Sequence, residues 1–264
     1  MLLFATLDRL KADLDDLRPV QAEPEPREQE RFELDWNYHA NALRGNSLTK
    51  DEIEALLVHG VTAARKPLRD HLAVWGHAAA VRGLEEVARG GRPLTEQHIR
   101  AAHRALLSQP YEKPGPGRDA PLAEGNQGPG HYKTSSNDWM SAGGKTVYFS
   151  SPEDTPARVA DLVCWYERET AHPMLHPVAL AATLHHRFLR VHPFADGNGR
   201  VARLLLNVVL LRYGYGIALL KAEDHDRYLA ALAAADAGEP EPFLHLPAAW
   251  WRTPAVSAPV PARR

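Results

Sequence analysis

Residues 192–203 read His-Pro-Phe-Ala-Asp-Gly-Asn-Gly-Arg-Val-Ala-Arg. Apolar residues at helical spacing lead into this stretch over 184–191. Pro193 disfavours the α conformation at the residue before it, so a first helix is predicted to end there. After a turn with two glycines, a second helix begins near residue 198. Its leucines and valines over 204–211 leave it no polar face, which predicts a buried central helix.

The chemistry of this stretch favours anion binding. Glycines allow the backbone to approach an anion closely, and a helix N-terminus presents N–H groups and a favourable dipole to it. Arg200 and Arg203 lie in the first turn of the second helix, where their charge opposes the dipole unless an anion is bound. Asn198 adds a neutral donor. Taken singly, these residues also fit a His-Pro turn, an Asp-Gly loop and two solvated arginines, but together they favour a site.

Two further side chains of the stretch have properties that phosphate chemistry requires. Asp196 offers a carboxylate of the kind that holds a phosphate-bound Mg²⁺. His192 offers the side chain whose unperturbed pKa lies near neutrality, as a general base requires. The stretch therefore predicts a phosphate site with a metal ligand and a base beside it.

The same stretch resembles the signature of the Fic family, H-x-F-x-D/E-G-N-G-R-x-x-R, and matches it at every specified position. The resemblance implies a mainly α fold, a Fic-type helical bundle with a small β-hairpin flap. It also implies a Mg²⁺-dependent protein nucleotidylyltransferase (AMPylation). Such an enzyme transfers a nucleoside monophosphate from an NTP, here expected to be ATP, to a Ser, Thr or Tyr hydroxyl of a target protein.

The resemblance implies a role for each matched residue. His192 is expected to be the catalytic base, Phe194 the core anchor of the loop and Asp196 the metal ligand. The expected nucleotide- and phosphate-binding residues of the stretch are Gly197, Asn198, Gly199, Arg200 and Arg203.

Two segments before the stretch add to the resemblance. Residues 130–133, Gly-His-Tyr-Lys, resemble the turn that enters the Fic core, with Lys133 where arginine is usual. Residues 137–140 and 145–149 flank a turn and carry a weak hairpin pattern. In the family this place holds a flap that clamps the target segment by strand pairing. The expected flap residues are Thr146, Val147 and Tyr148.

A segment after the stretch is also similar to the family. The helix predicted over 224–236 resembles the helix that follows the Fic core, where an aromatic side chain can face the nucleobase. Tyr228 is the candidate for that role, and a packing role is the alternative.

Residues 36–49 resemble the inhibitory helix that some Fic proteins carry N-terminal to the core, but the decisive positions differ. The family has Ser or Thr where this chain has Ala40, and a glutamate where it has Arg44, while the following Gly45 fits. In the family that glutamate pairs with the second arginine of the signature, here Arg203. A guanidinium cannot make this pair, so we expect an enzyme without the glutamate lock. Arg44 then either binds phosphate or points to solvent.

Helical patterns divide the rest of the chain. Helices are predicted over 3–17, 32–44, 50–59, 68–89, 95–107, 155–170, 176–190 and 224–236. Residues 19–30 are predicted to be a linker, 109–131 a long functional loop and 253–264 a disordered tail. With the resemblance, these give an N-terminal helical region (1–95) that includes the degenerate inhibitory helix at about 35–46, a Fic catalytic core (96–220), and a C-terminal helix and tail (221–264).

The composition excludes several classes of function. A formal charge of −2 over 264 residues, with both signs interspersed, predicts no nucleic-acid surface. The single cysteine, Cys164, is predicted to be buried, and it excludes an intramolecular disulfide and a cysteine-rich zinc site. Without a membrane-spanning run or a signal-peptide core, the protein is expected to be cytoplasmic and to have no membrane partner. The expected partners are a nucleotide and an unidentified target protein, and a homodimer stays open.

Two other functions would use the same site. One is a nucleotide hydrolase, or a transferase of another phosphate-containing group. The other is a non-catalytic nucleotide-binding regulatory module. The intact stretch 197–200 and the missing inhibitory glutamate disfavour the first. His192 disfavours the second, because a binding module has no use for a base.

Overall fold

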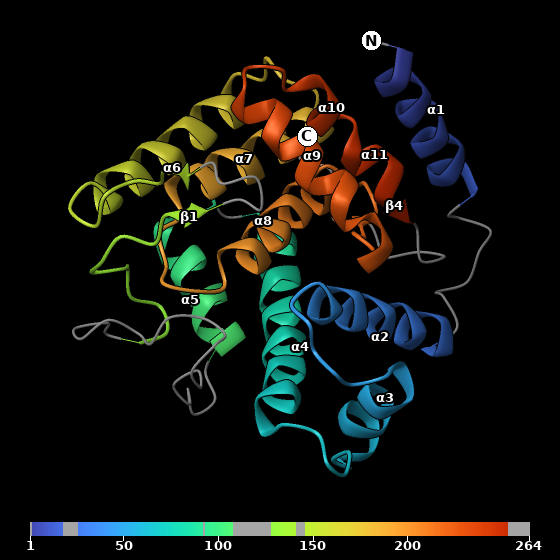
Figure 1. The fold of residues 1–264 in the computed structure, drawn as a ribbon. Helices are drawn as coiled ribbons and strands as arrows, with labels where there is room; N and C mark the ends of the chain where they lie inside the picture. Colours follow the sequence, from blue (N-terminus) through green and yellow to red (C-terminus); the bar gives the residue numbers. More distant parts are fainter. Residues whose placement is uncertain (1, 18–25, 92, 108–127, 141–145, 253–264) are drawn as a thin grey trace.

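The structure is a computed structural model that describes residues 2–17, 26–91, 93–107, 128–140 and 146–252 (Figure 1). Within these ranges its helices are α1 (Leu2–Leu17), α2 (Pro26–Ala42), α3 (Lys50–His59), α4 (Leu68–Arg89), α5 (Glu96–Leu107), α6 (Thr155–Ala171), α7 (Pro177–Val191), α8 (Asn198–Arg212), α9 (His225–Asp236), α10 (Glu241–Leu244) and α11 (Leu246–Trp250), with a 3-10 turn, η1 (Ala222–Asp224). Two antiparallel pairs of short strands join β1 (Trp139–Met140) to β2 (Thr146–Val147), and β3 (Ile217–Ala218) to β4 (Trp251–Arg252). The predicted mainly α fold with a small hairpin is confirmed.

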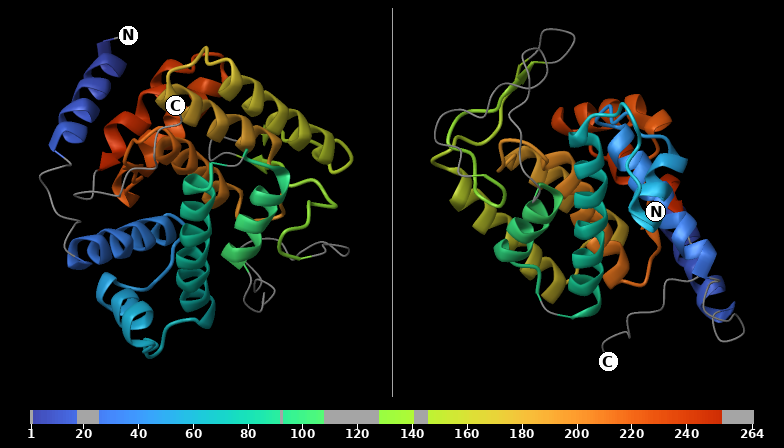
Figure 2. Two further views of the ribbon diagram at one scale, coloured as in Figure 1. Left: turned by 180° about the vertical axis from the view of Figure 1, so that it is seen from behind. Right: turned by 90° about the horizontal axis from the view of Figure 1, so that it is seen from below.

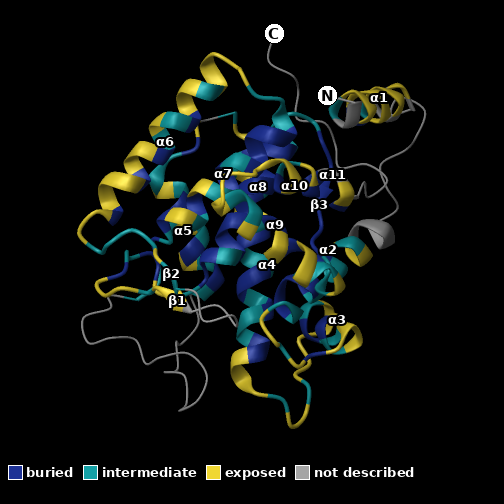
Figure 3. Ribbon diagram, turned by 45° about the horizontal axis from the view of Figure 1, so that its top comes forward, coloured by how far each residue is buried: buried dark blue, intermediate teal, exposed yellow. Residues whose placement is uncertain are grey.

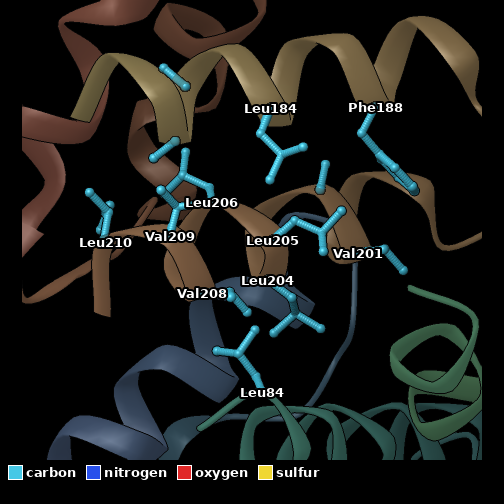
Figure 4. Packing of buried hydrophobic residues seen from close by; sticks show 14 of the residues in the cluster. Leu84, Leu184, Phe188, Val201, Leu204, Leu205, Leu206, Val208, Val209 and Leu210 are labelled. Atoms are coloured by element: carbon cyan, nitrogen blue, oxygen red, sulfur yellow. The ribbon is translucent and has the colours of Figure 1, made fainter. Parts of the chain in front are cut away.

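Helix α8 is the buried centre of the bundle, as its sequence predicted, and it packs against both α7 and α4 (Figures 1 and 3). Leu204 and Val208 point towards Leu84 of α4, while Leu184 of α7 points onto the opposite side of α8 (Figure 4). Full burial of one such side chain stabilises the fold by about 1.5–3 kcal/mol. The α7–α8 pair is therefore a rigid support for the loop that joins the two helices.

Helix α2 is attached to α4 by buried polar contacts. The Asn37 Nδ2 donates to the Val74 carbonyl oxygen at 2.9 Å. In the turn after α2, the Asp70 carboxylate accepts hydrogen bonds from the Ser47 N–H (2.9 Å) and hydroxyl (2.6 Å). These contacts fix the C-terminal end of α2 against the bundle.

Several element boundaries follow the predictions. Helices α3 and α4 begin and end where their patterns indicated, and Thr49 and Glu52 form the predicted capping box at the start of α3. Helix α2 begins at Pro26, however, and not at the predicted residue 32. Proline has no N–H to donate and suits the first turn of a helix, so part of the predicted linker is helical.

Other expectations are corrected or lie outside the described residues. Cys164 is exposed on α6, and not buried. Helices α10 and α11 and the β3–β4 pair were not predicted, because segments of two to five residues carry too little periodicity. Residues 109–127 of the predicted loop and the predicted tail 253–264 lie outside the described residues.

Helix α1 lies at the edge of the bundle (Figures 1 and 2). Its Asp8 carboxylate accepts hydrogen bonds from the Tyr215 hydroxyl and from His176 Nε2. Across the described ranges, none of the helices combines the length and the apolar character that crossing a membrane requires.

Gly76 marks a close approach of α4 to α5. A Cβ at this position would lie 2.4 Å from the Leu106 carbonyl oxygen, so alanine would force the two helices apart. We expect Gly76→Ala to lower the free energy of unfolding by about 1–3 kcal/mol, measured by urea denaturation. The matched control is Gly83→Ala in the same helix, where a Cβ meets nothing within 4 Å. Gly83→Ala should raise stability by about 0.5–1 kcal/mol, and equal effects of the two changes would contradict the tight contact.

Candidate active site

The loop between α7 and α8 contains two left-handed backbone positions. His192 follows α7 with φ 50°, and Gly197 precedes α8 with φ 78°. The Asn198 side chain closes the loop, since its Nδ2 donates to the Phe194 oxygen (2.7 Å) and its Oδ1 accepts from the Phe194 N–H (3.0 Å). Asn198 is only 2% exposed. Its amide therefore serves the loop, which corrects the expectation that this side chain donates to phosphate.

A buried histidine supports the loop from α5. The ring of His103 stacks on the fully buried Phe194, with centroids 3.8 Å apart. Its Nε2 donates to the Asp196 carbonyl oxygen (3.0 Å), and its Nδ1 accepts from the Gly130 N–H (2.7 Å). An imidazole that accepts at one nitrogen is neutral, and burial lowers the pKa of His103 to about 4. His103 thus joins the loop to the 130–133 turn.

A second support comes from the last residue of that turn and from the chain after it. The Lys133 N–H donates to the Pro193 oxygen (2.9 Å), and its Nζ donates to Asn137 Oδ1 (2.7 Å). Asn137 Nδ2 in turn donates to the Phe194 oxygen (2.8 Å). Burial lowers the pKa of Lys133 to about 8. Lys133, which stands where the family has arginine, is therefore buried and supports the loop through hydrogen bonds.

His192 is held in an orientation that suits a base. Its Nδ1 lies 3.3 Å from the Leu189 carbonyl oxygen, which only accepts, so Nδ1 carries the hydrogen and Nε2 is the acceptor nitrogen. The Phe149 ring stacks on the imidazole with centroids 3.9 Å apart. Burial lowers the pKa of His192 to about 4, helped by the charges of Lys133 and Arg44. The imidazole is therefore neutral at physiological pH, with Nε2 unprotonated.

Asp196 lies between two arginines. Its Oδ1 is 2.7 Å from Arg44 Nη2, and its Oδ2 is 3.7 Å from Arg200 Nη2. Burial raises the pKa of the Asp196 carboxyl, but the charges of Arg44 and Arg200 outweigh this effect and hold the pKa below its ordinary value. Arg44, for which phosphate binding and a position in solvent were both predicted, is therefore paired with Asp196 and remains partly exposed.

The signature arginines lie at the start of α8. Arg200 is buried, with 7% of its surface exposed. A Cβ on Gly199 would lie 3.4 Å from Arg203 Nη1, so the Arg203 guanidinium folds back beside the helix N-terminus. Two guanidiniums and the N-terminal end of a helix are thus brought together, as the anion-binding prediction requires.

Tyr228 is buried below Arg203, so its ring is not exposed to a nucleobase. It is 5% exposed, and its hydroxyl lies 3.3 Å from His185 Nε2. The hydroxyl also hydrogen-bonds the Arg203 side chain. Its ring packs at 5.8 Å from that of Trp250. Tyr228 therefore has the packing role that was the alternative, and it positions Arg203 from below.

The hairpin predicted as a flap forms next to His192. Trp139 pairs with Val147, and Met140 pairs with Thr146. Tyr148 is 69% exposed. The next residue, Phe149, turns inward onto His192, and its N–H is fixed by the Asp138 carboxylate at 2.9 Å. The hairpin therefore presents its edge beside the candidate base.

The arrangement fits a magnesium ion that arrives with a nucleotide. Asp196 offers one ionised carboxylate with a side chain that is 28% exposed. Among the residues that the structure describes, no group of three or more His, Cys, Asp or Glu side chains is placed to hold a metal. One carboxylate completed by phosphate oxygens and water is a usual setting for Mg²⁺.

Buried neutral histidines beneath the site should make the fold sensitive to acid. Burial lowers the pKa of His77 to about 3 and that of His185 well below its ordinary value, with nearby Arg203 adding to both shifts. Below about pH 6.5 the unfolded chain protonates these groups and the folded chain does not. Their contribution to stability is therefore present above about pH 6.5 and is lost as the pH falls.

Each of these two histidines lowers the free energy of unfolding by up to about 1.4 kcal/mol per pH unit below that point. Urea denaturation at about pH 7, 6 and 5 measures the slope. A stability that rises on acidification over this range would contradict the burial of neutral imidazoles at His77 and His185.

Both the sequence and the fold resemble those of known proteins. A profile of the Fic/DOC family matches residues 93–210. The solved structure of a Fic-domain-containing signalling protein from Bacteroides thetaiotaomicron is 33% identical and superimposes with a TM-score of 0.81, over 92% of this chain and 91% of that one. Fic-1 from Caenorhabditis elegans superimposes with a TM-score of 0.74 at 28% identity, over 94% of this chain and 67% of that chain.

One relative in sequence has a name that states an activity. The protein adenylyltransferase fic-1 of Caenorhabditis briggsae is 31% identical over 209 residues. The match covers 78% of this chain but only 37% of the relative's length. The chain belongs to the Fic/DOC family.

Proposed function

We propose that this protein is an adenylyltransferase that transfers AMP from ATP to a Ser, Thr or Tyr hydroxyl of a target protein. The observation that carries the proposal is the position of a neutral base, His192, at the start of the loop that leads to the helix N-terminus bearing Arg200 and Arg203. The curated relative that is named a protein adenylyltransferase supports the choice of reaction.

The chemistry follows from these positions. The hydroxyl oxygen of the target attacks the α-phosphorus of ATP, and His192 Nε2 takes its proton. The bond from the α-phosphorus to its bridging oxygen breaks, and pyrophosphate leaves. The N-terminus of α8 and its two arginines bind and orient the phosphates. Mg²⁺ held by Asp196 would neutralise phosphate charge when bound.

Double labelling tests the proposal. The protein is incubated with Mg²⁺, a cell lysate and ATP labelled at either the α- or the γ-phosphate, and the proteins are separated by electrophoresis. AMP transfer predicts that the α-label becomes attached to protein and the γ-label does not. Attachment of the γ-label would instead show phosphoryl transfer, and release of free nucleotide without labelled protein would show hydrolysis. UTP, CTP and GTP labelled at the α-phosphate identify the preferred base.

A further inference from the structure

The turn that follows α2 brings a third arginine to the site. Arg44 comes 152 positions before Asp196 in the chain, yet its Nη2 lies 2.7 Å from that carboxylate. The side chain is 48% exposed, so it lies at the mouth of the site and not within the core. The oxygen that it contacts belongs to the candidate metal ligand.

The position of Arg44 is set by the fold. Asn37 and Asn41 are buried, and Asn41 Nδ2 bonds Asn37 Oδ1 at 2.7 Å, which stiffens the last turns of α2. The Arg44 N–H donates to the Asn41 oxygen (2.9 Å), and Asn46 Nδ2 donates to the Asp70 oxygen (2.9 Å). The backbone on both sides of Arg44 is thus tied down, and only its side chain has freedom to change partners.

The positive charge gathered at the site favours the binding of an anion by Arg44. Arg44, Arg200 and Arg203 bring three positive charges to the N-terminal end of a helix, and Asp196 returns one negative charge. Arg44 is near enough to Arg203 and His192 for its charge to lower the pKa of both. A triphosphate carries the negative charge that such a group of arginines attracts. A cation on Asp196 would compete with the guanidinium for Oδ1, and a displaced Arg44 would then lie beside the phosphates.

We propose that Arg44 is a nucleotide-binding residue, which holds Asp196 before the nucleotide binds and moves to the terminal phosphates of ATP when Mg²⁺ takes that carboxylate. The proposal rests on the proposed function. The position that carries an inhibitory glutamate in related proteins would then carry a phosphate ligand in this one.

Affinity measurements test Arg44 without relying on turnover. In a His192→Ala background, calorimetry gives the Kd of ATP and of AMP in the presence of Mg²⁺. We expect Arg44→Ala to raise the Kd of ATP about ten-fold or more, because a charge-assisted contact to the outer phosphates is lost. The Kd of AMP, which lacks those phosphates, should stay within about two-fold. Arg44→Lys should retain part of the ATP affinity, as a point charge without the guanidinium fork.

The control is Arg89→Ala, which removes a surface ion pair of similar kind with Glu85 (3.2 Å) and should change neither Kd. A tighter Kd for ATP in Arg44→Ala would show that Arg44 only masks Asp196, and an unchanged Kd would show no role. Equal losses for ATP and AMP would show a structural effect. Each of these three results overturns the proposal. Failure of the chain with Arg44 intact to bind ATP at all would instead refute the proposed function itself.

Discussion

His192→Ala is expected to slow AMP transfer by about 10²–10⁴-fold and to leave ATP affinity within about two-fold of the unmodified chain. The imidazole is neutral, its Nδ1 hydrogen is directed to the Leu189 oxygen, and Nε2 is the nitrogen that accepts. A base that acts only on the attacking hydroxyl contributes to the transition state and little to ground-state binding. Initial rates of labelling and calorimetric Kd values measure the two effects separately.

The matched control for this change is His186→Ala. His186 belongs to α7 as well, but its Nε2 lies 2.9 Å from Asp236, away from the loop. We expect His186→Ala to transfer AMP at a rate near that of the unmodified chain. If His192→Ala also kept the full rate, another group would have to be the base. If it lost ATP affinity in proportion to rate, His192 would instead act in binding.

Asp196→Asn is expected to lower AMP transfer about 10²-fold at low Mg²⁺, with partial recovery as Mg²⁺ is raised. Asparagine keeps the shape of the side chain but lacks the charge that holds a hard cation, and charge stabilisation by such an ion is worth several kcal/mol. The measurement is the rate as a function of Mg²⁺ concentration. The loop itself should persist, because the Asp196 contact with His103 uses the backbone oxygen.

The shape of the Mg²⁺ dependence decides the role of Asp196. A half-saturating concentration shifted upwards supports a metal ligand. A lower rate with an unchanged half-saturating concentration would mean that Asp196 acts mainly by pairing with Arg44 and Arg200. Asp138→Asn serves as the control, since the Asp138 carboxylate bonds the Phe149 N–H and is separate from that pair. It should leave the Mg²⁺ dependence unaltered.

Much of the fold was predictable because local patterns and tertiary packing agree in this chain. The apolar residues of α8 face neighbours on more than one side. The absence of a polar face in its sequence therefore predicted correctly that this helix is the centre of the bundle. The start of α2 was missed because Pro26 and its neighbouring glutamates suit a linker as well as a helix N-terminus.

The site was predictable only where one continuous stretch carries it. His103, Asn137 and Phe149 support the loop from three separate segments, and no spacing in the sequence connects them to residues 192–203. The only available signal was the presence of His103 in a helix with a strong apolar face. The Asn198 amide was assigned to phosphate because the sequence does not show that Phe194 offers it two backbone partners.

The sequence also left the directions of two side chains undecided. Two roles were predicted for each of Arg44 and Tyr228. A helical pattern predicts which face of a helix a residue lies on, but not which partner its side chain contacts. In the structure, Tyr228 packs against His185 and Trp250. Arg44 pairs with Asp196 because the turn after α2 lies beside the α7–α8 loop.

The attachment of Gly130 to α5 has a consequence for the length of the chain that connects them. Gly130 donates to His103 and accepts from Arg100 Nε at 2.7 Å, so the chain returns to the same helix that it leaves at Leu107. The connecting residues thus begin and end on one rigid element, whatever their number. For a flexible connection between two fixed points, the free energy of closure grows only with the logarithm of the length, about 0.6 kcal/mol for each doubling. We therefore expect a reporter peptide or a protease site inserted between Leu107 and Gly128 to change the free energy of unfolding little, because Gly130 keeps its attachment to α5.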